Sequence, residues 1–180
     1  MSPAPFRALT LRGTGRLNVL SCQVQVSLPS AAVGTATQHP YTAVWDTGAT
    51  ASVITAKVVS GLSLGPTGVT QVNTVGGVKT SNVFLVDIWL PNKVRAENIQ
   101  VTDGHIVGGD VLIGMDIIGA GDLSITNVNG ITVMSFRYPS MKEIDYVQEA
   151  HRIDLMGTPR RARRAATLAD RKAQKKGFRA

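Results

Sequence analysis

Apolar and polar residues alternate along much of this 180-residue chain, as in strands with one buried face. The strands predicted in this way are 6–12, 19–27, 42–45, 94–101, 110–114, 123–126 and 131–137, together with a long β-branched stretch at 69–90. Residues 115–118 fit a single helical turn, and residues 55–59 fit either a short helix or a strand. The pattern therefore predicts an all-β body with one short helix.

Two glycine-containing dipeptides predict hairpin turns within this body. Gly76-Gly77 divides the stretch 69–90, and Asn129-Gly130 separates the last two predicted strands. Both dipeptides readily adopt the positive φ angles of a two-residue hairpin turn. We therefore expect a long hairpin with its tip at Gly76-Gly77.

The pattern changes after residue 138. Residues 139–156 have apolar side chains at helical spacing and are predicted to form a helical extension. Residues 151–180 carry ten Arg or Lys and two Asp, whereas residues 1–150 carry nine basic and ten acidic residues. Residues 157–180 are therefore predicted to be a basic tail, helical or disordered, with nonspecific polyanion contact as one function.

Composition limits the other functions. Cys22 is the single cysteine, so it cannot form an internal disulfide, and it suits a reducing cytoplasm. No secretion signal and no membrane-spanning stretch are predicted. His39, His105 and His151 are scattered and lack the spacing of metal ligands, so we expect no metal site and no cofactor.

The strongest chemical signal is Asp46-Thr47-Gly48-Ala49, which follows the apolar run 42–45. A carboxylate at the end of a buried strand can be aimed at a second carboxylate by a tight turn, and Gly48 permits that close backbone approach. An ordinary Asx turn after a strand is the alternative interpretation. The motif resembles the active-site loop of an aspartic peptidase.

Together with the Gly76-Gly77 hairpin and Leu112-Ile113-Gly114, this motif resembles the retropepsin-like aspartic peptidases, in particular their cellular and bacterial single-domain members. The resemblance implies an acid-protease half-barrel, one lobe, within residues 1–138. It implies Asp46 as the catalytic residue and Thr47, Gly48 and Ala49 as its loop. It further implies a substrate-binding flap formed by Val75, Gly76, Gly77 and Val78. It also implies a structural support beneath the loop, formed by Leu112, Ile113 and Gly114. Trp45 and Thr50 depart from the common family residues.

The chain contains one Asp-Thr-Gly motif, whereas peptide hydrolysis by this chemistry needs two carboxylates that share a proton. An active enzyme must therefore be a homodimer with Asp46 from each subunit on the twofold axis, acting on protein or peptide substrates. Two alternatives remain open. One is an inactive member of the family that binds peptides or serves as a dimerisation module, and the other is a β-domain that delivers the basic tail to nucleic acid.

Overall fold

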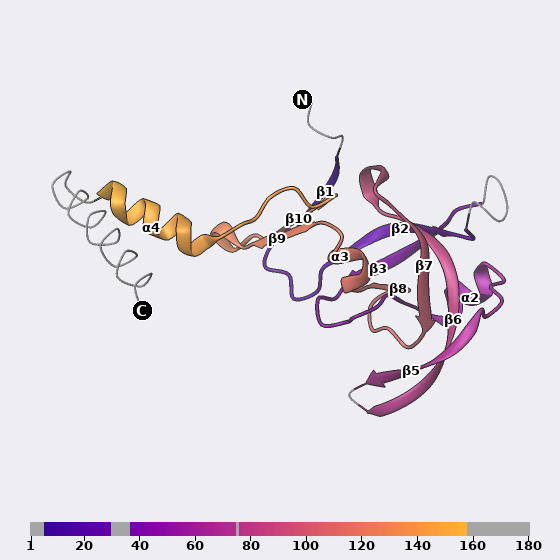
Figure 1. Ribbon diagram of the computed structural model, residues 1–180. Coiled ribbons are helices and arrows are strands. Elements are labelled where there is room, and N and C mark those ends of the chain that lie inside the picture. The colour runs from indigo at the N-terminus through magenta and orange to yellow at the C-terminus, as the bar shows by residue number, and fades with distance from the viewer. Residues whose placement is uncertain (1–5, 30–36, 75, 158–180) are drawn as a thin grey trace. The chain divides into compact units, whose positions relative to one another are not determined.

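The computed structural model describes residues 6–29, 37–74 and 76–157, which divide into two units (Figure 1). The first unit is Met1–Met141 and the second is Lys142–Ala180. The described strands all belong to the first unit, and the second contains helix α4 (Tyr146–Gly157). The predicted tail 157–180 lies almost wholly outside the described residues, so its polyanion contact stays a prediction.

Seven strands of the first unit form one sheet in the order β2-β3-β8-β4-β7-β6-β5. Their bounds are β2 Ser21–Ser27, β3 His39–Trp45, β4 Val53–Ile54, β5 Gly68–Thr74, β6 Gly77–Trp89, β7 Arg95–Asp103 and β8 Val111–Ile113. Strand β2 also pairs with the end of β6, so the sheet closes on itself through six strands. Strand β5 pairs only with β6 and extends outside this closed part.

The chain ends of two parallel strands place the candidate site. Strands β3 and β8 run parallel with Trp45 opposite Ile113, whereas most other pairs are antiparallel. Because parallel strands leave a sheet at the same edge, Asp46 and Gly114 emerge beside each other. This pairing joins segments that are 68 residues apart in the sequence, counted from Trp45 to Ile113.

A second sheet packs against Trp45 of the first sheet. It contains β1 (Arg7–Arg12), β10 (Val133–Tyr138) and β9 (Asp122–Thr126), in that order. The Trp45 ring lies 5.2 Å from the buried Phe136 ring, centroid to centroid, and its indole N–H donates to the Cys22 sulfur at 3.3 Å. The large aromatic at position 45 is therefore a core residue that joins the two sheets.

Short helical segments complete the first unit. Helix α2 (Ala56–Gly61) shows that the ambiguous segment 55–59 is helical, and α3 (Met115–Ile118) is the predicted single turn. Two 3₁₀ turns lie at Pro91–Lys93 and Val128–Gly130. The predicted all-β class is confirmed. Among the described residues, no helix has the length and apolar character needed to cross a membrane.

The carboxylate of Asp122 connects strand β9 to residues of β10 and to the segment that follows β10. Asp122 accepts hydrogen bonds from the Ser140 hydroxyl at 2.5 Å, the Met141 N–H at 2.9 Å and the Arg137 Nε at 2.9 Å. These donors, with Ser140 contributing most, hold the pKa of Asp122 well below its usual range. A depressed pKa in the folded state means that ionised Asp122 stabilises the fold above the unfolded pKa, and that this contribution is lost as the pH falls.

We therefore expect Asp122→Asn to lower the melting temperature at pH 7 and to flatten its fall between about pH 5 and pH 2. Thermal unfolding followed by circular dichroism across this range measures both effects. Glu97→Gln is the control, because Glu97 is largely exposed and pairs only at the surface with Arg95. If the melting temperature of Asp122→Asn fell as steeply with decreasing pH as that of the wild type, this role of Asp122 would be contradicted.

Candidate active site

The Asp46 loop begins where β3 ends. The Asp46 N–H donates to the Ile113 carbonyl at 3.0 Å, which continues the β3–β8 pairing by one residue. The Gly48 N–H then donates to Asp46 Oδ1 at 2.8 Å, so the turn itself orients the carboxylate. Asp46 is half-buried, whereas Thr47 and Gly48 are exposed. The arrangement presents one carboxylate toward solvent in a fixed direction.

Glycine at position 48 has a local reason. A Cβ atom built on Gly48 would lie 3.2 Å from Asp46 Oδ1, closer than ordinary van der Waals contact. Any larger residue would therefore press on the oxygen that accepts the Gly48 N–H. The sequence argument for a close backbone approach at Gly48 agrees with this geometry.

The predicted support, Leu112-Ile113-Gly114, lies directly against the loop. A Cβ atom on Gly114 would lie 2.6 Å from the carbonyl carbon and oxygen of Ala51 and 3.0 Å from the Ala49 oxygen. Beyond Gly114, the Met115 N–H donates to the Ala49 carbonyl at 2.8 Å and the Asp116 N–H to the Thr50 carbonyl at 3.2 Å. The start of α3 therefore holds the loop through its backbone.

A pair of polar side chains, Ser52 and Asp116, forms a second attachment that the sequence analysis missed. The Ser52 hydroxyl donates to Asp116 Oδ1 at 2.8 Å, and the Ser52 N–H donates to Oδ2 at 2.9 Å. The hydroxyl oxygen also accepts the Gly114 N–H at 3.1 Å. Ser52 is fully buried, and a buried hydroxyl needs such partners.

Asp116 accepts the Ile117 N–H at 2.9 Å within α3. Its larger role is to connect α3 to the residue that follows the Asp46 loop. A serine placed among apolar residues, as in Ala51-Ser52-Val53-Ile54, is the feature that indicates a buried hydrogen-bond partner elsewhere in the chain.

The predicted flap corresponds to the β5–β6 hairpin, the curved arm labelled β5 and β6 in Figure 1. Thr74 pairs with Gly77, and Gly77 has φ +108°, a conformation that favours glycine. Gly76 lies in the turn, Val78 is 65% exposed, and Val75 lies outside the described residues. The hairpin is present, and its role as a flap stays a prediction.

In the described part of the chain, no group of three or more His, Cys, Asp or Glu side chains has the arrangement of a metal site. Asp46 itself offers a carboxylate on a tight turn that backbone hydrogen bonds hold in place. Such a group can accept or donate a proton when a second acid lies beside it.

Comparison with known proteins agrees with this site. Residues 31–117, just under half of the chain, match the family model described as aspartyl protease. The matched segment includes the Asp46 loop, the β5–β6 hairpin and Leu112-Ile113-Gly114. This match confirms the resemblance to the aspartic peptidases that the sequence predicts.

Solved structures with a similar fold carry retropepsin-like or viral protease names. One is a retropepsin-like aspartic protease from Rickettsia conorii, with 11% identity, a TM-score of 0.46, and coverage of 77% of this chain and 99% of that chain. Another is the EIAV protease complexed with the inhibitor HBY-793, with 21% identity, a TM-score of 0.43, and coverage of 57% and 86%. A third is the simian foamy virus protease, with 16% identity, a TM-score of 0.36, and coverage of 54% and 92%. No curated protein matches the chain.

Proposed function

We propose that this chain is a homodimeric aspartic endopeptidase in which two symmetry-related Asp46 carboxylates hydrolyse a peptide bond. The observation that carries this proposal is the geometry of the Asp46 loop. One carboxylate, oriented by the Gly48 N–H, stands at the edge where β3 and β8 end, on a backbone that α3 holds in place. The sequence contains a single Asp-Thr-Gly motif, so a second copy of the chain must supply the partner carboxylate.

The reaction follows from two carboxyl groups that share one proton. The ionised Asp46 removes a proton from a water molecule, and the resulting hydroxide attacks the carbonyl carbon of the peptide bond. The protonated Asp46 of the other subunit donates its proton to the carbonyl oxygen. The tetrahedral intermediate then collapses as the amide nitrogen receives a proton and leaves. Like charges about 3 Å apart cannot both ionise cheaply, so the pair titrates as one coupled unit.

The β5–β6 hairpin suits binding of an extended substrate. Strand β5 has β6 on one side and no strand on the other within the described sheet, so its outer backbone groups are open to a peptide. A peptide added in this way is held by backbone hydrogen bonds, and alternate side chains are read by pockets. We infer that Gly76-Gly77 lets the tip of this hairpin move to cover a bound peptide. We also infer that the enzyme acts in the cytoplasm, because a chain with the single cysteine Cys22 suits a reducing compartment.

Cleavage of a mixed peptide library, measured by mass spectrometry at several protein concentrations and pH values, tests the proposal. We expect specific activity to rise with protein concentration and to level off where sedimentation shows the dimer to be complete, because only the dimer contains two Asp46 residues. Specific activity that stays constant while the chain sediments as a monomer would exclude the shared site. Absence of cleavage under conditions where the dimer is complete would exclude peptidase activity on these substrates.

A further inference from the structure

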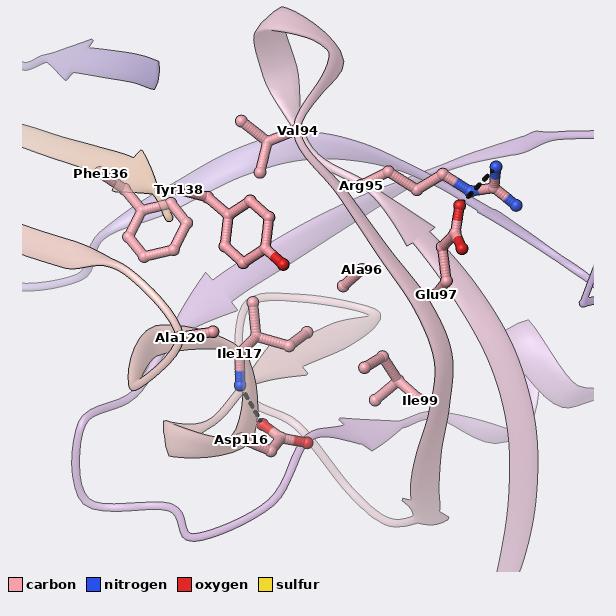
Figure 2. Close-up of a pocket in the computed structure, with 10 residues that line it drawn as sticks. All are labelled: Val94, Arg95, Ala96, Glu97, Ile99, Asp116, Ile117, Ala120, Phe136 and Tyr138. Atoms are coloured by element: carbon pink, nitrogen blue, oxygen red, sulfur yellow. Dashed lines mark hydrogen bonds and ion pairs between the residues drawn. The ribbon is translucent and has the colours of Figure 1, made fainter. Parts of the chain in front are cut away.

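A cavity of about 410 Å³ lies in the first unit, and its lining residues do not include the Asp46 loop (Figure 2). It is bounded by β7, α3 and β10, with the buried side chains of Ile117 and Phe136 in its wall. The small residues Ala96 and Ala120 leave room between these elements. Cavities of this size accommodate small organic molecules, and apolar walls with a few polar groups are typical of ligand sites.

Figure 2 shows the Tyr138 hydroxyl directed toward the space bounded by Ala96 and Ile117. Tyr138 is 45% exposed, so its ring forms one side of an accessible opening and does not belong to the closed core. Together with Ile99 on β7, these side chains bound an apolar space within the cavity. An aromatic ring fits such a space and can pack against the Tyr138 and Phe136 rings.

The charged groups at the cavity favour a cation. Arg95 forms ion pairs with Asp87 at 2.7 Å and with Glu97 at 2.8 Å, so its charge is more than balanced. Asp116 also lines the cavity, and it forms no ion pair with any described residue. Among the residues that line the cavity, the carboxylates of Glu97 and Asp116 outnumber the one guanidinium, that of Arg95, and give a formal charge of −1.

Asp116 retains room for one more donor. Its two oxygens accept the Ser52 hydroxyl, the Ser52 N–H and the Ile117 N–H, three of about four sites that a carboxylate offers. Among the described residues, the Ser52 N–H is the one donor to Oδ2, so that oxygen can accept a hydrogen bond from a ligand. A charge-assisted bond to this oxygen is stronger than a bond between neutral groups.

We propose that this cavity binds a small aromatic cation, with its ammonium or amidinium group on Asp116 and its ring between Ile117 and Tyr138, and that binding changes the position of the Asp46 loop. The second half of this proposal rests on the proposed peptidase function. The connection is short: Asp116 holds Ser52, and the backbone of Met115 and Asp116 holds the loop at Ala49 and Thr50. A ligand that donates a hydrogen bond to Oδ2 weakens the bond from the Ser52 N–H to that oxygen, and the loop can then shift.

The experiment is titration of the full-length ¹⁵N-labelled chain with benzylamine, benzyl alcohol and methylamine, followed by amide chemical shifts. Benzylamine supplies both ring and charge, benzyl alcohol supplies the ring alone, and methylamine supplies the charge alone. We expect benzylamine to bind about tenfold more tightly than either. Its shifts should be largest at Asp116 and Ile117 and should extend to Ser52 and Gly48. Equal affinity for benzylamine and benzyl alcohol would overturn the assignment of the cation to Asp116.

Three variants locate the site. Asp116→Asn is expected to remove the preference for benzylamine, and Ala120→Phe, at an exposed position at the mouth of the cavity, is expected to block both ring-containing probes. Ala120→Phe keeps the proposal testable even if Asp116→Asn disturbs the fold. The Asp46→Asn variant should still bind benzylamine. If Asp46→Asn lost benzylamine binding while Asp116→Asn retained it, the cation would lie on Asp46 and the proposal would be overturned.

Activity separates the two proposals. These titrations need no catalysis, so they test the ligand site even if the peptide library is not cleaved. If the library is cleaved and benzylamine binds at Asp116, we expect saturating benzylamine to change kcat while KM stays near its original value. An unchanged kcat at saturation, with no shift at Gly48, would overturn the connection to the loop while leaving the peptidase proposal intact.

Discussion

Replacing Asp46 with Asn is expected to abolish peptide cleavage, with kcat/KM lower by about 10³-fold or more. An asparagine amide cannot take a proton from water, whereas its carbonyl oxygen can still accept the Gly48 N–H that holds Asp46 Oδ1 at 2.8 Å. The loop should therefore keep its shape, and the melting temperature should change little. Library cleavage and peptide affinity are measured in parallel for the wild type and for Asp46→Asn. If the protein only bound peptides and had no catalytic activity, neither the wild type nor the variant would cleave the library.

Mixing the two chains sharpens the test. If each active site needs both Asp46 carboxylates, three Asp46→Asn chains for each wild-type chain leave about one dimer in sixteen fully active after exchange. Activity should then follow the square of the wild-type fraction. Asp103→Asn is the matched control, since Asp103 is also a strand-end carboxylate that accepts a backbone N–H, that of Asn82 at 2.7 Å. Activity that falls in direct proportion to the wild-type fraction would show that one carboxylate suffices.

Local patterns carried most of the strand predictions. Alternation at 19–27 predicted β2, and the β-branched stretch around Gly76-Gly77 predicted the β5–β6 hairpin, because each pattern reflects contacts between near neighbours in sequence. Asn129 and Gly130 do adopt positive φ angles of 53° and 74°, as their residue types favour, between two antiparallel strands. Turn chemistry of this kind is local and can be read without knowledge of the fold.

The parts that the sequence did not reveal depend on long-range pairing. Nothing local indicates that β2 pairs with β6 to close the sheet, or that Ser52 meets Asp116, 64 residues away. The pairing of β8 with both β3 and β4 brings Ser52 and Asp116 together. The Asp46 loop was predicted from its motif, whereas its attachment through Ser52 required the three-dimensional structure.

The loop attachment leads to a second large effect, at Gly114. We expect Gly114→Ala to lower kcat by about 10²-fold and to destabilise the fold by about 2 kcal/mol. The backbone at Gly114 has φ −94°, which alanine adopts readily, so the cause is steric alone. The added methyl group would lie 2.6 Å from the Ala51 carbonyl group, which must move away and take the Asp46 loop with it. Steady-state cleavage and thermal unfolding of the same preparation measure the two effects.

Gly65→Ala is the control for this substitution, because a Cβ atom at Gly65 meets nothing within 4 Å. The same chemical change there should leave both activity and melting temperature close to the wild-type values. The comparison separates displacement of the loop from the general effect of replacing a glycine, since only Gly114 lies against Ala49 and Ala51. If Gly114→Ala retained wild-type kcat, the backbone of the Asp46 loop would tolerate movement, and close support by β8 and α3 could not be what positions the carboxylate.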